Sequence, residues 1–171
     1  MPMLTGVDVT LRAWRDADVA ELEALRNDVA LQQQLMAQPR PNSRARVLQW
    51  LNDRSARADG VFFVIAAASD DRVLGYVQLA DMDLFHGRAQ LGICLSAAAQ
   101  GRGLAGQVMA LLEGYVREVF GLRKIGLEVL CSNAQAIRFY DKQGFATVGV
   151  LRQHAFVQGA HVDVLVMEKL L

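Results

Sequence analysis

The chain has 171 residues, of which 53% are hydrophobic and 21% charged, a balance typical of a folded domain with a sizeable core. Its formal net charge is zero, which argues against a general binder of nucleic acids or membrane surfaces. No apolar run approaches the roughly 20 residues that span a bilayer, and the start of the chain shows no secretion signal. Both cysteines lie in apolar runs without metal-ligand spacing. We therefore expect two buried free thiols, no metal site, and one cytoplasmic domain over residues 1–171.

The first half of the chain predicts two helices among several strands. In order, the expected elements are a strand over 7–11, a helix with apolar positions from Val19 to Val29, a second helix up to about Arg57, and a hairpin of strands over 61–68 and 72–79. Asp16 can cap the first helix. Asn42 or Ser43 can cap the second helix, after a break at 38–42 that contains two prolines.

The second half of the chain alternates strands and helices. The expected elements are a strand over 89–96, a long helix from Leu104, a strand over 124–130, a short helix over 134–143, and strands near 146–152 and 161–170. Gly121 is placed to end the long helix. Antiparallel stretches around one strand–helix–strand crossover predict a mixed α/β (α+β) domain. We expect about seven mostly antiparallel strands flanked by helices.

A glycine-rich turn joins the strand at 91–95 to the long helix. Its residues are Gln100, Gly101, Arg102, Gly103, Leu104, Ala105 and Gly106. Glycines let a backbone approach a pyrophosphate, and the N-terminus of a helix adds partial positive charge. The turn lacks the Lys-Ser or Lys-Thr of a P-loop, and it lies too far along the chain for a dinucleotide fingerprint. By itself the turn indicates either a diphosphate-bearing cofactor or a tight connection without a ligand.

A second motif follows one helix and one strand later. Asn133 leaves a strand and opens a short helix, and Tyr140 lies two turns further along the same face. Taken together, the two motifs resemble those of the GNAT superfamily of N-acetyltransferases. The matching residues are Gln100, Gly103 and Ala105 in the turn, and Asn133, Ala136, Tyr140, Gly144 and Phe145 in the second motif. The resemblance covers about residues 60–171.

The resemblance implies acetyl-CoA as the co-substrate. Backbone N–H groups of residues 100–106 would hold the pyrophosphate, with Arg102 near the phosphates and Asn133 in the same site. Two central strands would splay apart, and the free backbone around Ile93 and Leu95 would pair with the pantetheine arm. A backbone N–H in that gap would stabilise the oxyanion that develops on the thioester.

An amine that attacks a thioester needs help with two protons. Tyr140 resembles the general acid of the family, which protonates the departing thiolate; a core tyrosine is the alternative. Glu128 lies in an apolar strand, where some family members place a catalytic glutamate. We expect it to be partly removed from water and to take the amine's proton through a water molecule. An ion-paired or solvated strand residue is the alternative for Glu128, and Asp81, Asp83 and His86 are rival bases.

Three branches that resemble this chain use different acceptors: ribosomal-protein N-termini, spermidine, and nucleotide-linked amino sugars. Gln78 and Gln90 stand where the spermidine enzymes carry glutamates, which weakens a polyamine interpretation. Arg26 belongs to a stretch similar to the Arg-Asn element of the amino-sugar branch. The segment that follows offers five arginines suited to a diphosphate: Arg40, Arg44, Arg46, Arg54 and Arg57. A nucleotide-linked amino sugar is one expected acceptor. An N-terminal peptide or a polyamine is the alternative, with the arginines then forming a solvated helix face.

The expected partner is a small-molecule or peptide amine, with no nucleic acid and no membrane. The sequence leaves the oligomeric state open, including a homodimer. A protein of another class, a non-catalytic acyl-CoA-binding regulatory domain, could share the fold. The glycine-rich turn, Asn133 and Tyr140 occur together, and this favours an enzyme.

Overall fold

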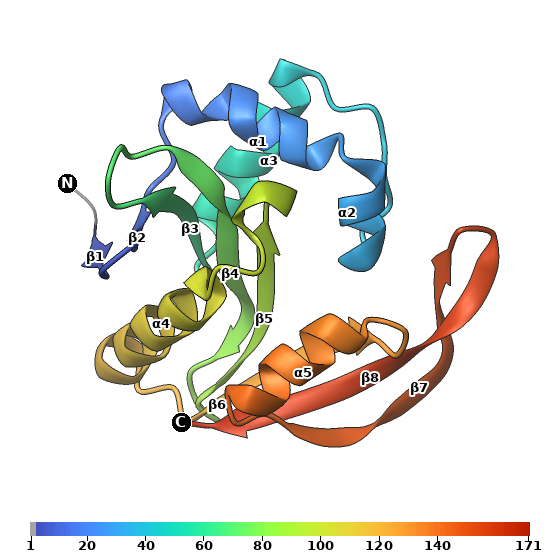
Figure 1. The fold of residues 1–171 in the computed structure, drawn as a ribbon. Helices are drawn as coiled ribbons and strands as arrows, with labels where there is room; N and C mark the ends of the chain where they lie inside the picture. The colour runs from blue at the N-terminus through green and yellow to red at the C-terminus, as the bar shows by residue number, and fades with distance from the viewer. Residues whose placement is uncertain (1–2) are drawn as a thin grey trace.

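The computed structural model describes residues 3–171, which form one eight-stranded sheet (Figure 1). The strands are β1 Leu4–Thr5, β2 Val9–Arg12, β3 Val61–Ala67, β4 Val73–Asp83, β5 Arg88–Leu95, β6 Lys124–Leu130, β7 Ala146–Val157 and β8 Ala160–Leu170. Their order across the sheet is β1-β2-β3-β4-β5-β6-β8-β7, and every neighbouring pair is antiparallel except β5 and β6. The predicted fold class, mixed and mostly antiparallel, is confirmed. The short β1 adds a strand to the number expected.

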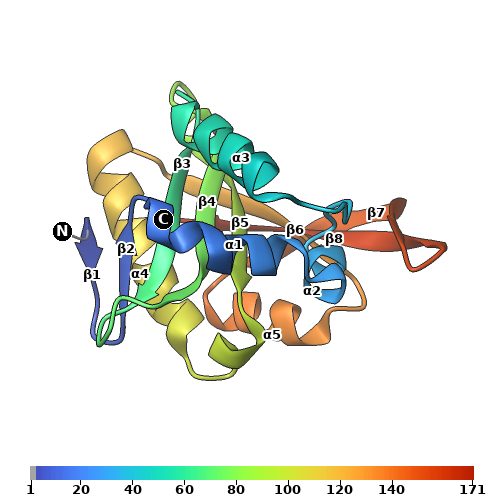
Figure 2. The ribbon, with the colours of Figure 1, turned by 90° about the horizontal axis from the view of Figure 1, so that it is seen from above.

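Helices cover both faces of the sheet (Figures 1 and 2). They are α1 Val19–Arg26, α2 Val29–Gln34, α3 Arg44–Ala56, α4 Leu104–Phe120 and α5 Ala134–Lys142. Successive residues of β3 point to opposite faces and so enter two different cores. Val64 packs with Leu22 and Leu51 of α1 and α3, and Ile65 lies in the core that contains Val108 of α4. Figure 2 looks down on α1 and α3.

Glycines in the left-handed region set both ends of α4. Gly103, at its N-cap, has a φ of +72°, and Gly121, at its C-cap, has a φ of +66°. The N–H of Gly121 donates to the carbonyl of Arg117 at 3.2 Å, which closes the last turn. The predicted end of the long helix at Gly121 is therefore confirmed.

The segment 16–34 differs from the predicted helix, whose apolar positions ran from Val19 to Val29. A 3-10 turn over Asp16–Asp18 precedes α1, which ends at Arg26, and a separate α2 starts at Val29. Asp28 accepts a backbone N–H from the first turn of α2 at 3.0 Å and caps that helix. Val29, predicted to face the core, is 55% exposed. The break places Arg26 at the C-terminal end of α1, next to α2.

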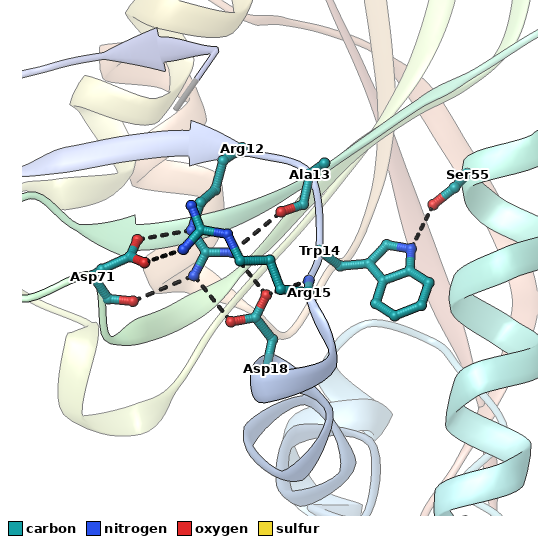
Figure 3. Close-up of polar contacts among 7 residues, drawn as sticks. All are labelled: Arg12, Ala13, Trp14, Arg15, Asp18, Ser55 and Asp71. Atoms are coloured by element: carbon teal, nitrogen blue, oxygen red, sulfur yellow. Dashed lines mark hydrogen bonds and ion pairs between the residues drawn. The ribbon is translucent and has the colours of Figure 1, made fainter. Parts of the chain in front are cut away.

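A buried arginine ties the start of α1 to the sheet (Figure 3). The side chain of Arg12, at the end of β2, is 2% exposed and donates to both carboxylate oxygens of Asp18 at 2.7 and 2.9 Å. It also donates to Asp71 in the β3–β4 turn at 2.8 Å, and Arg15 pairs with the same carboxylate. Asp18 also accepts the N–H of Arg15 at 2.8 Å. The predicted cap at Asp16 is wrong, because Asp18 is the N-cap residue of α1 and makes no side-chain cap hydrogen bond. Arg12 is thus a fully partnered, structural cation.

Two smaller predictions are resolved by the same structure. Ser43 caps α3, because its hydroxyl accepts the N–H of Arg46 at 3.2 Å. Cys94 is buried as expected, whereas Cys131 is exposed. The prediction of two buried thiols is therefore wrong for Cys131, which lies in the turn that follows β6 rather than in the strand.

Candidate active site

The turn between β5 and α4 leaves open space in front of its backbone. Gly101 and Gly103 both have a φ of +72°, a conformation that favours glycine. A Cβ built on either residue would meet no other atom within 4 Å. Gln100 donates to the carbonyl of Leu95 at 3.1 Å and ties the turn to the end of β5. The first N–H groups of α4 have no partner within the helix, so the turn fits an anion such as a pyrophosphate.

The central strands β5 and β6 pair only near their beginnings. The paired residues are Arg88 with Lys124, Ala89 with Ile125, and Gln90 with Gly126. Beyond that point β5 stays paired with β4 as far as Leu95, and β6 stays paired with β8 as far as Leu130. The two strands diverge, so the predicted splayed pair is confirmed. In the part of the chain that the structure describes, the β6-facing edge of β5 at Ile93 and Leu95 has no strand partner.

One cavity of about 1270 Å³ connects this turn, the gap between β5 and β6, and the underside of α1, α2 and α3. We call the part lined by Gln100, Gly101 and residues 103–106 of the turn, with Ile93, Leu95 and Asn133, the turn end. We call the part lined by Arg26, Gln32, Trp50, Arg54 and Tyr76 the helix end. Tyr140 and Glu128 also line this cavity. The structure therefore brings both predicted catalytic residues and the predicted turn to one continuous space.

Tyr140 reaches the cavity from α5. Asn133 caps that helix as predicted, since its Oδ1 accepts the N–H of Ala136 at 3.2 Å. The Tyr140 ring packs against Phe139 and Phe145, with ring centroids 5.2 and 5.5 Å apart. Burial raises the pKa of Tyr140 to about 12, so the phenol keeps its proton at neutral pH. A protonated phenol in this position is able to serve as a general acid.

Glu128 reaches the cavity from β6, and its side chain is exposed. The expectation that it is partly removed from water is therefore wrong, because residue 128 lies on the open side of the strand. Of the rival bases, Asp81 also lines the cavity, but it pairs with Arg57 at 3.1 Å. Asp83 and His86 contact each other in the β4–β5 turn and do not line the cavity.

Two neutral amides lie on the sheet inside the cavity. Gln78 lies over Gly92, where a Cβ would come within 3.3 Å of its Nε2. Gln90 lies over Gly126, where the corresponding distance would be 2.9 Å. Each glycine thus makes room for an amide side chain. The two positions that weaken a polyamine interpretation do face the candidate site, and both are uncharged.

The wall of the helix end contains residues that the sequence analysis missed. Trp50 of α3 packs edge-on against Tyr76 of β4, with ring centroids 5.1 Å apart. The guanidinium of Arg26 lies 4.5 Å from the centroid of the Trp50 ring. Gln32 of α2 is buried and accepts from Arg26 at 3.3 Å. A usable signal was the spacing of Trp50 and Arg54, which are four residues apart and share one face of α3.

Three arginines predicted to bind ligands lie outside the cavity. Arg102 lines a separate hollow with Glu21 and Asp28. Arg44 and Arg46 are exposed in the first turn of α3, whereas the later turns of that helix line the cavity. Arg26 does line the cavity, as predicted. Basic composition alone does not distinguish these positions, because the helix rotates each side chain by about 100° from the last.

Neither a metal-binding cluster nor a membrane-spanning helix is found in residues 3–171. No group of three or more His, Cys, Asp or Glu in that range could hold a metal ion. No helix there is long and apolar enough to cross a membrane.

Comparison with known proteins agrees with this geometry. A family model described as the acetyltransferase (GNAT) domain matches residues 8–146. YokL, an uncharacterized N-acetyltransferase of Bacillus subtilis derived from prophage SPbeta, is 24% identical over 93% of this chain and 88% of its own length. The spermidine N(1)-acetyltransferase of Escherichia coli is 32% identical over 68% of this chain, and the match spans 60% of that enzyme. The crystal structure of spermidine N-acetyltransferase from Vibrio cholerae, in complex with CoA and spermine, has a TM-score of 0.88 and 26% identity, covering 95% of each chain.

The family model covers more than half of the chain, and it includes the turn and the whole of the second motif. The resemblance predicted from those motifs is confirmed, as is the prediction of an acetyltransferase. The chain belongs to the GNAT family of acetyltransferases.

Proposed function

We propose that residues 1–171 act as one catalytic domain, which transfers the acetyl group of acetyl-CoA to a primary amine by direct attack. One observation carries this proposal. A single cavity joins the open glycine turn, the gap between β5 and β6, and the side chains of Tyr140 and Glu128. Donor and acceptor can therefore meet in one space without a covalent enzyme intermediate.

The turn end would hold the coenzyme. Its glycines and the N-terminal N–H groups of α4 suit the pyrophosphate, and the unpaired edge of β5 at Ile93 and Leu95 suits the amide groups of the pantetheine arm. Asn133 lines the same part of the cavity. Bound there, acetyl-CoA supplies a thioester, the activated acetyl group that the reaction needs.

Two side chains would move the protons. Glu128 takes a proton from the ammonium through water, so that the amine nitrogen has a free lone pair. A carbon–nitrogen bond then forms at the thioester carbonyl and the carbon–sulfur bond breaks. Tyr140 gives its phenolic proton to the departing sulfur. Its raised pKa, about 12, keeps that proton available at neutral pH. The proton that the nitrogen loses as the amide forms returns to Tyr140 through water.

Several kinds of primary amine are candidates for the acetyl acceptor. A nucleotide-linked amino sugar or a peptide with a free N-terminus carries a primary amine that could bind beside Glu128. A polyamine is a second candidate, because relatives from Escherichia coli and Vibrio cholerae are spermidine acetyltransferases.

An amine panel tests the proposal. The protein is incubated with acetyl-CoA and, separately, with nucleotide amino sugars, polyamines, peptides with free N-termini and amino acids. Release of the CoA thiol is followed with a thiol reagent, with the Tyr140→Phe variant as the catalytic control. We expect amine-dependent thiol release that this variant largely loses. Binding of acetyl-CoA without release by any amine would instead identify a non-catalytic acyl-CoA-binding domain.

A further inference from the structure

Arg26 is a half-buried cation that the protein leaves without a carboxylate. Its Nε is buried and has no hydrogen-bond partner in residues 3–171, and none of the ion pairs found there involves it. A guanidinium has five N–H donors, and the hydrogen bond to Gln32 at 3.3 Å uses only one of them. Leaving a charged donor unsatisfied away from water is costly, so its retention points to a ligand.

The guanidinium is also held in place before any ligand arrives. Trp50 lies under it at 4.5 Å, a distance suited to a cation–π contact. Gln32 is fixed in turn, because its Nε2 donates to the carbonyl of Leu25 at 2.9 Å. The carbonyl of Arg26 accepts from Asn42 at 3.0 Å. Contacts from α2, α3 and the segment before α3 thus orient one cation on the cavity wall, which lowers the entropic cost of binding an anion.

Arg54 provides a second cation at the same end. It lies one turn after Trp50 on α3 and lines the same cavity. Within residues 3–171 it too has no ion-pair partner. Two carboxylates line the cavity, Asp81 and Glu128, and Asp81 is already paired with Arg57. The cavity therefore offers two free cations at the helix end and one free carboxylate, Glu128 of β6.

We propose that the acceptor is a primary amine that also carries a carboxylate or phosphate group. Arg26 and Arg54 bind the anionic group, which directs the ammonium toward Glu128 and the thioester. This inference rests on the proposed acetyl transfer and adds the substrate class to it. A polyamine has only positive charges, so it would be repelled by the two arginines and would leave Arg26 unsatisfied.

Matched pairs of amines test the proposal. The pairs are β-alanine with β-alaninamide, and glucosamine 6-phosphate with glucosamine; spermidine is the polycation. Within at least one pair we expect the anionic member to have the higher kcat/KM, by about 10- to 100-fold, the range for losing a hydrogen bond to a charged group. The pair that shows the preference identifies carboxylate or phosphate as the anion.

Variants then connect the preference to the two arginines. Arg26→Gln should reduce kcat/KM for the anionic amine by about 10-fold or more and reduce it less for the neutral one, so that the preference within the pair shrinks. Arg26→Lys, which retains the charge, should recover part of the loss. Arg54→Gln should show a smaller loss of the same kind. Arg44→Gln is the matched control, because it removes an exposed arginine of α3 outside the cavity.

The outcomes separate this inference from the proposed function. Thermal melting and calorimetric affinity for acetyl-CoA establish that each variant is folded. If amines are acetylated but folded Arg26→Gln keeps the full preference, or if spermidine is preferred over every anionic amine, the inference is wrong and acetyl transfer stands. If acetyl-CoA binds and no amine is acetylated, both are wrong.

Discussion

Backbone groups form most of the turn end of the cavity, whereas side chains form the helix end. The turn end consists largely of backbone: two left-handed glycines, the start of α4, and a strand edge that has lost its partner. The helix end consists of side chains from α1, α2, α3 and β4, with Trp50 in contact with both Arg26 and Tyr76. Backbone N–H groups recognise the same anionic group whatever the surrounding side chains, whereas a side-chain wall can change with each substitution. We infer that the turn end serves the common donor and the helix end selects the acceptor.

We expect the largest effect from replacing Tyr140, which lines the cavity that connects the turn end and the helix end. Tyr140→Phe removes the phenolic proton and keeps the packing against Phe145, so kcat should fall by about 10²- to 10⁴-fold, the usual range for general acid catalysis. Steady-state kinetics and calorimetry measure this, and affinity for acetyl-CoA should stay nearly unchanged. Tyr115→Phe, in α4 and outside the cavity lining, is the matched control. Turnover of Tyr140→Phe within twofold of the native protein would reduce Tyr140 to a packing role.

A methyl group on the turn tests whether the backbone forms the donor site. Gly103→Ala places a Cβ in the open space where the pyrophosphate is expected, and should raise the Kd for acetyl-CoA about 10- to 100-fold, as overpacking typically does. Gly159→Ala, in the β7–β8 turn, has a φ of +82° and equally open surroundings. Both variants should lose about 1–2 kcal/mol of stability to left-handed strain. Equal affinity of the two variants for acetyl-CoA would contradict a pyrophosphate site at residues 100–106.

Glu128→Gln tests the proposed proton acceptor, and we expect an effect of intermediate size on the rate. The change keeps the shape and removes the base, so the rate near neutral pH should fall by roughly tenfold. This is below the usual range for a general base, because water can replace an exposed carboxylate. The rate should recover as the pH approaches the pKa of the amine itself. A pH–rate profile identical to that of the native protein would transfer the role to Asp81 or to water.

We expect the smallest effect, a change in Tm, from the ion pairs of Arg12 that tie the start of α1 to the sheet. The hydrogen bond from Arg12, with help from Arg15, holds the pKa of Asp71 below its ordinary value. A carboxyl group with a lowered pKa stabilises the fold above its unfolded pKa, about 4, and that contribution disappears as the pH falls through the folded value. Asp71→Asn should therefore lower Tm slightly at pH 7 and flatten its decline below pH about 4. Asp70→Asn, in the same turn and outside the ion pairs, is the control. A parallel decline of Tm in native protein and Asp71→Asn would show that the cluster adds nothing measurable.

The turn end could be predicted from the sequence because its parts are local. Gly103, Asn133 and Tyr140 lie at fixed spacings along single elements, and each element formed close to its expected bounds. The helix end depends on contacts between residues far apart in the chain, and local patterns do not encode such contacts. Trp50 was not among the residues singled out from the sequence. The apolar spacing from Val19 to Val29 also fits one continuous helix, whereas a new helix, α2, starts after Asp28 and sets the position of Arg26. The apolar neighbours of Glu128 in sequence, Leu127 and Val129, lie in the core, whereas Glu128 itself is exposed, and the sequence does not show which elements cover each residue.

A crystal structure of the protein with bound CoA tests the central claim most directly. We predict that the pyrophosphate contacts backbone N–H groups of residues 100–106 and that the pantetheine arm follows the β5 edge beyond Gln90. Its sulfur should then lie within hydrogen-bond reach of the Tyr140 hydroxyl. A coenzyme bound elsewhere, or a gap closed by continued pairing of β5 with β6, would contradict the account.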